Sequence, residues 1–538
     1  MEKRVLLALV LSFAILIVWQ VLVINKMPQE KPETEVSEFE PLVAKSEEEP
    51  AIKEVPAKAE VSTSSLLLDP EKVKEIDVVV DMPLYNAVFT TNGGGLKSFQ
   101  LKEYRENLTL ESPLIDLITE KSKKTIPLSS YFTRNGMVVL ENLLYQCDKK
   151  RIWGEKEGKE TLTFFQELKG GMRVEKIYTF SPDTYLIECE LRLKGEEETR
   201  YGLKAELSWA WGKAPYTKED RYSHTGLVFL KDSKINHKKV DDIEEEPTIE
   251  DGIQWAGSED KYFLSAIIPP EDSKSTLRVI KGESNSKAHI VFSSHMTGLG
   301  EHAVSRYKIY LGSKDYEILK KAGHDLAKVI NFGWVDIIAK PLLVFLRFVN
   351  QYLHNYGLAI IFLTVVIKIA FIPLTHTSYK SMKEMQKLQP KMTEIREKYK
   401  DDKEKLNKEI MELYKNNKIN PLSGCLPILL QLPVFIALYK VLMGSIELRH
   451  APFFLWIQDL SAKDPYYVTP ILMGGSMFLQ QKLTPTAMDP MQAKMMLVLP
   501  AVFTLMFLSF PSGLVIYWFV SNLLSIFQQF YIHRQFGG

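Results

Sequence analysis

A lysine inside a long apolar run is the residue of this chain whose chemistry most needs an explanation. Lys368 lies between Leu358 and Leu374, in a segment where nearly every other side chain is apolar. A charge at the centre of a helix in lipid costs roughly 2.5–3.5 kcal/mol on insertion scales, so such a residue usually lines a water-filled cavity. The alternative is that the long aliphatic stem of the lysine carries its ammonium group to the nearest interface.

Polar side chains also occur in the apolar segments that follow Lys368. They are Gln431, Ser476, Thr504, Ser521 and Asn522. Polar groups shared among several helices, together with one cation, indicate a wet groove between the helices and favour the cavity interpretation of the lysine. The apolar segment 495–509 is short for a hydrocarbon core of about 30 Å, which predicts local thinning of the bilayer.

No pattern typical of an enzyme or a metal centre is found. The histidines between positions 224 and 302 are scattered, with no His-Glu-x-x-His and no Gly-x-Ser-x-Gly sequence. Cys147, Cys189 and Cys425 have no metal-ligand spacing. Cys147 and Cys189 could pair if their region is extracytoplasmic, but two free thiols are the preferred interpretation. We therefore expect no catalytic residue, no metal site, no cofactor and no small-molecule substrate.

The distribution of apolar residues divides the chain into unlike parts. The 538 residues carry a formal net charge of zero and are 46% hydrophobic, but the long apolar runs lie only near the two ends. Residues 1–24 are predicted to be a transmembrane signal anchor, because Lys3 and Arg4 precede a run long enough to cross a bilayer and no small-x-small cleavage site follows. Residues 25–75, rich in Pro and Glu, are predicted to be a flexible linker.

Residues 76–315 show the alternation of β-strands. Apolar and polar residues alternate clearly over 185–193, and turn sequences at 92–95 and 181–183 separate the strand candidates. No regular succession of strands and helices is visible, so βαβ units are not expected. The pattern predicts one large extracytoplasmic domain that forms an antiparallel β-sandwich.

The remaining residues are predicted to be mainly helical. Residues 316–357 should hold a linker helix and an amphipathic helix that lies in the outer interface. Residues 358–538 should form a core of five transmembrane helices, which makes six with the anchor. The five candidate spans are 358–375, 422–444, 467–483, 495–509 and 514–532.

The loops between the spans support this topology. With the amino terminus in the cytoplasm, loop 376–420 is cytoplasmic and contains twelve Lys and Arg. The outer loop 445–466 contains only Arg449 and Lys463. This asymmetry follows the positive-inside rule, and it places the carboxyl terminus in the cytoplasm as well.

Loop 376–420 is predicted to be a cytoplasmic helical hairpin. Apolar residues recur at three- and four-residue steps on both sides of Asp401–Asp402, and several of them are methionines, among them Met382 and Met385. The methionines suit plain packing and contact with varied apolar peptides equally well. The excess of positive charge could attract lipid headgroups or ribosomal RNA, or could simply be solvated. The lysines concerned include Lys383, Lys387 and Lys391.

Six short motifs carry a resemblance to a known family. In chain order they are Ile372–Thr375, Leu388–Lys391, Asn420–Leu422, Gln431–Phe435, Leu455–Leu460 and Phe510–Leu514. They stand in the order seen in the YidC/Oxa1/Alb3 membrane protein insertases, and the chain resembles this family over its whole membrane half. The six predicted spans and the large outer domain are similar to the YidC type of Gram-negative bacteria.

The resemblance implies a mechanism for the odd lysine. In the family, a hydrophilic groove opens to the cytoplasm and to lipid and is closed on the outer side. It accepts the polar stretch of an incoming chain, while the apolar segment slides into lipid along the third and fifth spans. The groove cation of the family is usually arginine, which Lys368 replaces here without the bidentate fork. The other implied groove residues are Thr364, Gln431, Tyr517, Trp518, Ser521 and Asn522, with Trp518 in place of a tyrosine that is common in the family.

The resemblance also implies function, partners and location. The protein is expected to act without enzyme activity as a membrane protein insertase and chaperone that inserts and helps fold nascent inner-membrane proteins. It would work alone or with the Sec translocon, SecYEG and SecDF. The ribosome and membrane lipids are further expected partners. The expected location is the bacterial cell inner membrane, with the large domain in the periplasm.

Three other functions are considered. A secondary transporter would show internal repeats and paired broken helices, which are not seen. An intramembrane protease would need a Ser–His pair, an Asp pair or zinc ligands within its spans, and the spans contain none of these. The third possible function is carbohydrate processing, by an outer domain tethered to a membrane part that is purely structural. A sugar platform for it could be built from Trp209, Trp211 and Trp255, for which packing in the core is the favoured interpretation.

Overall fold

The computed structural model of the chain describes most residues from Lys74 to Phe536. Excepted are 119–125, 136, 142, 156, 196–201, 213–223, 239–246, 251, 272–273, 282–286, 300–301, 401, 418–425 and 484–489. The predicted anchor 1–24, nearly all of the predicted linker 25–75, the motif Asn420–Leu422 and Cys425 lie outside the described residues.

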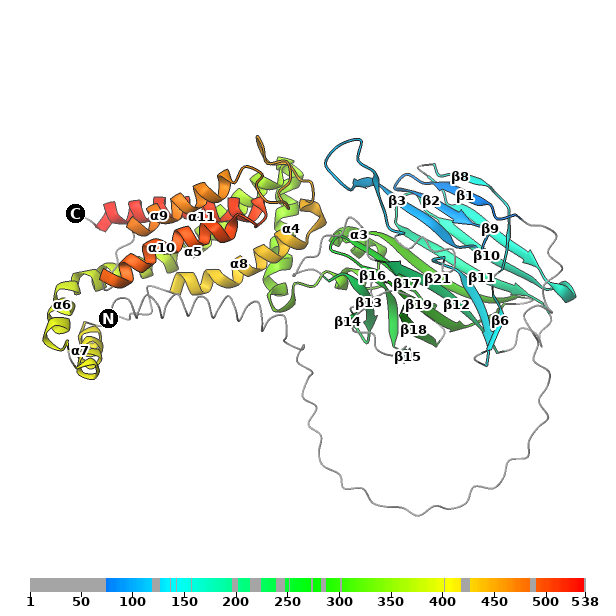
Figure 1. The fold of residues 1–538 in the computed structure, drawn as a ribbon, viewed down its shortest axis with the longest axis horizontal. Helices are drawn as coiled ribbons and strands as arrows, with labels where there is room; N and C mark the ends of the chain where they lie inside the picture. Colours follow the sequence, from blue (N-terminus) through cyan, green and yellow to red (C-terminus); the bar gives the residue numbers. More distant parts are fainter. Residues whose placement is uncertain are drawn as a thin grey trace, which may run out of the picture. The chain divides into compact units, whose positions relative to one another are not determined.

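Three β-sheets form the predicted β-rich domain (Figure 1). The first sheet has the order β4-β3-β2-β1-β8. Its strands are β1 (Asp77–Asp81), β2 (Tyr85–Thr90), β3 (Leu96–Arg105), β4 (Leu114–Asp116) and β8 (Arg151–Trp153). The third sheet has the order β15-β18-β19-β12-β5-β6. Its strands are β5 (Ser130–Arg134), β6 (Met137–Leu140), β12 (Leu203–Gly212), β15 (Thr248–Glu250), β18 (Ser275–Lys281) and β19 (Lys287–His295).

The second sheet is the largest, with the order β14-β13-β16-β17-β21-β11-β10-β9-β7 and with β20 paired to β21. Its strands are β7 (Gln146–Cys147), β9 (Glu160–Glu167), β10 (Arg173–Phe180), β11 (Leu186–Lys194), β13 (Gly226–Lys231), β14 (Lys234–Lys238), β16 (Ile253–Glu259), β17 (Phe263–Ile268), β20 (Thr297–Leu299) and β21 (His302–Ser313). Period-two burial is clearest along β10, where every second residue is buried.

The predicted β-rich domain is therefore confirmed, but the single antiparallel sandwich was too simple. The described strands form three sheets, and β1 pairs with β8 in parallel, with Val79 opposite Arg151. Parallel neighbours need a crossover connection, and here the chain leaves β1, builds β2 to β7 in all three sheets and returns as β8. No local pattern in the sequence marks a pairing between segments this far apart.

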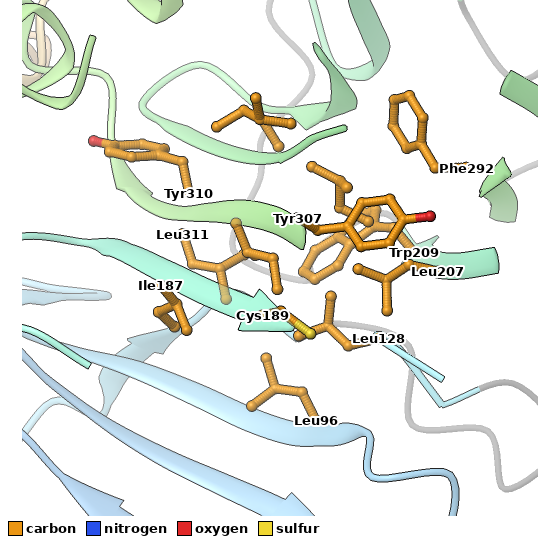
Figure 2. Close-up of a cluster of buried hydrophobic side chains, with 14 of the residues drawn as sticks. Leu96, Leu128, Ile187, Cys189, Leu207, Trp209, Phe292, Tyr307, Tyr310 and Leu311 are labelled. Carbon is orange, nitrogen blue, oxygen red and sulfur yellow. The ribbon is translucent and has the colours of Figure 1, made fainter. Parts of the chain in front are cut away.

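The domain is held together by one hydrophobic core (Figure 2). Figure 2 shows side chains from different sheets meeting there, among them Leu96 of β3, Cys189 of β11 and Leu207 of β12. Trp209 and Trp255 are 2% and 0% exposed, and the indole N–H of Trp209 donates to Ser258 Oγ at 2.9 Å. Their burial confirms the packing interpretation of these two tryptophans. Cys147 and Cys189 are free thiols.

Helices make up the second half of the chain. After α3 (Tyr316–Ala322) and the short η4 (Leu326–Val329) and η5 (Gly333–Val335), a second hydrophobic core joins the long helices. These are α4 (Asp336–Leu353), α5 (Tyr356–Lys387), α8 (Leu426–Gly444), α9 (Val468–Leu483), α10 (Pro490–Phe507) and α11 (Ser512–Phe536). Helix α11 lies alongside α5 and α9, and α9 lies alongside α10 (Figure 1).

The described residues identify two of the five predicted spans by length and apolar character. Within the described part of the chain, two helical segments are long and apolar enough to cross a membrane, Tyr356–Lys387 and Ser512–Ile532. Two shorter apolar segments are Gln431–Gly444 and Met496–Phe507. The count of six spans stays a prediction.

Helix α4 has two unlike faces. It buries Ala339, Leu343, Leu346 and Val349 in the second core, while Ile337, Val344, Phe348 and Tyr352 are exposed. An exposed apolar stripe of this kind on a packed helix suits contact with lipid. The amphipathic helix is therefore present as expected, and its location in the outer interface stays a prediction.

The cytoplasmic hairpin differs from the prediction in its first arm. Helix α5 continues without a break from the predicted span to Lys387, so Met382, Met385, Lys383 and Lys387 lie on the same helix as Lys368. Two shorter helices follow, α6 (Gln389–Lys398) and α7 (Lys403–Asn416), and Tyr414 donates to Met392 Sδ at 3.4 Å between them. The break comes at Leu388, and Pro390 follows in the first turn of α6, where a missing N–H is tolerated.

Candidate functional site in the helical core

A ladder of polar side chains runs along one face of α11. Ser521, Ser525 and Gln529 follow one another at four-residue steps, which places them above one another on a helix. All three are buried, at 5%, 8% and 6% exposed. These three side chains face neighbouring helices and not lipid. In a membrane helix, polar side chains on such a face normally serve contact with another helix or with a ligand.

Lys368 of α5 joins this ladder directly. Its ammonium group donates to Ser525 Oγ at 2.7 Å, and Ser525 Oγ donates in turn to the backbone carbonyl of Ser521 at 2.9 Å. The lysine is half-buried, and among the described residues no carboxylate forms an ion pair with it. The five predicted spans contain no Asp or Glu at all. The charge is therefore held by neutral oxygen atoms, which leaves it able to attract an anionic group.

Three further hydrogen bonds connect the ladder to other helices. Gln431 of α8 donates to Ser521 Oγ at 3.1 Å. Gln529 donates to the hydroxyl of Tyr379, on α5, at 2.5 Å. Beside the ladder, Asn522 donates at 3.1 Å to Ser476 Oγ of α9. The polar ladder, which we define as Lys368, Tyr379, Gln431, Ser476, Ser521, Asn522, Ser525 and Gln529, thus connects four helices.

Two of the predicted groove residues, Thr364 and Trp518, lie apart from the polar ladder, and a third, Tyr517, lies beside Gln431. Thr364 is buried one turn before Lys368, and its hydroxyl donates to its own helix at Ile360 O, 2.6 Å away. Trp518 packs edge-on against Phe435, with ring centroids 4.7 Å apart, and against Phe507. Tyr517 is 2% exposed within the second core. The structure therefore brings together Lys368, Gln431, Ser521 and Asn522. Thr364 and Trp518 lie in packing positions, and Tyr517 is buried next to Gln431.

Ser525, Gln529 and Tyr379 were not among the predicted site residues. The four-residue spacing from Ser521 would have indicated the first two, whereas only the fold reveals Tyr379 as a partner. A second lysine in the predicted span 422–444 was also missed. Lys440 donates to the carbonyl of Phe332 at 2.8 Å, near the end of α8, so its charge has a local structural partner.

One end of the helical core is closed by the loop 445–466. Two segments of the quoted motifs meet here, because Gly513 N–H donates to Leu460 O at 3.0 Å and Ser512 Oγ donates to Asp459 O at 3.0 Å. A Cβ on Gly513 would lie 3.2 Å from Leu460 O, so this close approach favours glycine. Hydrogen bonds from Thr469 of α9 and from Tyr466 and Trp456 of the loop outweigh burial and lower the pKa of Asp464.

An arginine joins this closed end to α3 and α4. Arg347 of α4 contacts Asp315, the N-cap residue of α3, at 3.2 Å and Glu447 at 3.1 Å. Glu447 belongs to the short η7 (Ile446–Leu448) and its side chain is 6% exposed. Burial, and then the charge of Asp315, raise the pKa of Glu447 to about 7, because one arginine cannot neutralise two carboxylates.

Comparison with known proteins decides the family. The profile of the YidC periplasmic domain matches residues 77–345, and that of the 60Kd inner membrane protein matches residues 348–537. A membrane protein insertase YidC of Syntrophus aciditrophicus is 46% identical over 99% of this chain and 100% of its own length. The chain belongs to the YidC family of membrane protein insertases. A YidC of Geobacter metallireducens is 43% identical over 99% of this chain and 98% of its own length.

Membership of the YidC family confirms the main functional prediction. The chain is a membrane protein insertase of the inner membrane with a periplasmic domain, and the family is not enzymatic. A crystal structure of an active YidC insertase is also similar, with 18% identity over 87% of this chain and 94% of that chain. Its TM-score of 0.38 is too low for a comparison of individual elements.

Proposed function

We propose that this YidC-family insertase receives the polar part of an incoming membrane protein at the polar ladder. The half-buried ammonium group of Lys368, which among the described residues is held by the neutral Ser525, carries the proposal. An acidic or polar stretch would replace water around this cation, while the adjoining apolar segment moves into lipid. Transfer of about twenty apolar residues from water to lipid supplies the driving force, so no nucleotide is required.

Residues 358–538 form the insertase core in this proposal. Six spans, with both termini in the cytoplasm, agree with the charge of the loops. Residues 1–24 act as the signal anchor and 25–75 as the flexible linker, residues 76–315 form the periplasmic domain, and residues 316–357 connect it to the core. The loop 445–466 closes the outer end, so the proposed groove opens to the cytoplasm and to lipid.

The cytoplasmic hairpin is the proposed first contact for a client. Loop 376–420 contains twelve basic and eight acidic residues, and α5 links this charged surface to Lys368 along one continuous helix. Nascent membrane proteins are the clients that the family name implies. The Sec translocon, the ribosome and membrane lipids are proposed as further partners, since a basic surface attracts ribosomal RNA and anionic headgroups.

Replacement of Lys368 tests the proposal. In a strain depleted of its own insertase, Lys368→Arg should insert clients with acidic outer segments at the normal rate, while Lys368→Ala and Lys368→Glu should slow them. Lys482→Ala is a matched control, because this lysine is exposed at the end of α9. Normal insertion by Lys368→Glu, at normal expression, would show that the cation attracts no client.

A further inference from the structure

Two histidines and a glutamate come together at one edge of the periplasmic domain, far in sequence from the polar ladder. His224 lies just before β13, His237 on β14 and Glu259 at the end of β16. One ring nitrogen or carboxylate oxygen from each lies within 4.8 Å of the others. The imidazole rings have centroids 4.7 Å apart, and His237 Nδ1 lies 2.9 Å from Glu259 Oε1.

The strand register explains why these side chains meet. Val228 of β13 pairs with His237, and Gly226, two residues away on the same face, pairs with Glu259. The glycine between the two side chains leaves room for the ring of His224, because a Cβ at Gly226 would lie 3.3 Å from His224 Nε2. Gly226 also has φ +151°, which side-chain-bearing residues rarely adopt.

The hydrogen bond made by His224 leaves its other ring nitrogen available to a metal ion. His224 Nε2 lies 3.1 Å from the carbonyl of Leu227, and since a carbonyl only accepts, Nε2 carries the proton and Nδ1 keeps its lone pair. A backbone carbonyl on the second nitrogen is the usual support of a histidine ligand. Burial is the main cause that lowers the pKa of His224. For Glu259 the effects of Lys314 and His237 outweigh burial and lower the pKa.

We propose that His224, His237 and Glu259 bind a divalent d-block cation, for which Zn²⁺ fits the donor set best. Two imidazoles and one carboxylate, with an open fourth position, are a set that zinc uses in proteins. Ligand atoms around a tetrahedral zinc ion lie about 3.3 Å apart, so the cluster needs only a small inward movement. The exposed ring of His237 can supply this movement.

Lys314 sets the strength of this site. Its ammonium group contacts the other oxygen of Glu259, Oε2, at 2.6 Å. Glu259 is a buried residue, 2% exposed. The lysine thus keeps the buried carboxylate ionised when no metal is bound, but its charge also opposes a second cation. The site should therefore bind more tightly when Lys314 is replaced by a neutral residue.

Metal binding by the purified full-length protein tests the proposal. The probes are Zn²⁺ alone, measured by calorimetry, and Co²⁺ alone, whose visible absorption reports tetrahedral coordination. The wild type should bind one ion at this site, and His237→Gln should weaken that binding about tenfold or more. Lys314→Gln should strengthen it. His295→Gln, a histidine of the same domain outside the cluster, is the control and should bind like the wild type.

Two results would overturn the proposal. One is unchanged Zn²⁺ affinity in His237→Gln, because binding would then occur at other histidines. The other is an absence of tetrahedral Co²⁺ absorption in both the wild type and Lys314→Gln. Because His237 is exposed, its replacement should not prevent folding, and a thermal melt without metal verifies this. Insertion activity does not enter the measurement, so this test is independent of the proposed groove.

Discussion

The ammonium group of Lys368 lies 2.7 Å from the hydroxyl of Ser525. Ser525 belongs to α11, which begins at Ser512, far from Lys368 in the sequence. The hydroxyl donates its hydrogen bond to the carbonyl of Ser521 and accepts one from the lysine through a lone pair. Ser525 is therefore a positioning residue. It holds the cation on the polar ladder but does not neutralise it.

Removal of this hydroxyl should weaken insertion less than removal of the lysine. Ser525→Ala keeps the charge but frees its position, so we expect slower insertion of clients with acidic outer segments. The double variant Lys368→Ala/Ser525→Ala should be no slower than Lys368→Ala alone, since the serine would act through the lysine. Ser509→Ala, at an exposed serine, is the control. Additive defects would contradict the positioning role.

The contact between α9 and α10 should tolerate no larger residue at Gly474. A Cβ there would lie 1.9 Å from Thr504 Oγ1, so the helices would have to separate. Overpacking of this kind costs about 1–3 kcal/mol, and Gly474→Ala should lower the thermal midpoint in detergent. Gly475→Ala should not, because a Cβ at that glycine meets nothing within 4 Å. Thr504→Ala should restore stability to Gly474→Ala, and a failure to do so would place the strain elsewhere.

Stability should depend on pH through Glu447. The ordinary pKa of this carboxyl is 4.5, whereas in the folded protein it is about 7, so between these values the folded state holds a proton that the unfolded chain has lost. The contribution of Glu447 is therefore fully present below pH 4.5 and is lost as the pH rises through 7. Each unit of pKa shift corresponds to about 1.4 kcal/mol, so the effect should be measurable.

Thermal melts of the wild type and Glu447→Gln across this pH window would measure the effect. The glutamine variant should lose most of the fall in stability with rising pH, because its amide does not titrate. Glu317→Gln, near the start of α3, is the control and should retain the slope of the wild type. Equal slopes in the wild type and Glu447→Gln would show that other groups cause the dependence.

Charge reversal on the hairpin should slow insertion in a salt-dependent manner. Lys383, Lys387 and Lys391 changed together to Glu should reduce the insertion rate more at low salt than at high salt, because surface fields fade within about 10 Å at 0.1 M salt. Insertion kinetics measured across a salt series provide the test, with the three lysines changed to Gln as the control for lost packing. A defect of equal size at every salt concentration would indicate that the fold of α5 or α6 was damaged.

The chain's own pattern determined the division into a β domain and a helical core. Alternation of apolar residues is a local property of the sequence, and so is the long apolar run around Lys368, which α5 contains as expected. The unbroken continuation of α5 into the hairpin could also have been predicted, because no glycine or proline lies between Leu374 and Lys387. The span was predicted to end where the charged residues begin, but charged residues do not by themselves end a helix.

Only the tertiary structure decided which polar residues act together. Ser525 is paired with Lys368, and His224 with His237 and Glu259, by the packing of helices and the register of strands. The parallel pairing of β1 with β8 has the same origin. Spacing along a chain indicates neighbours only within one helix or strand, because partners on different elements are set by the burial of the whole apolar surface, to which every element contributes.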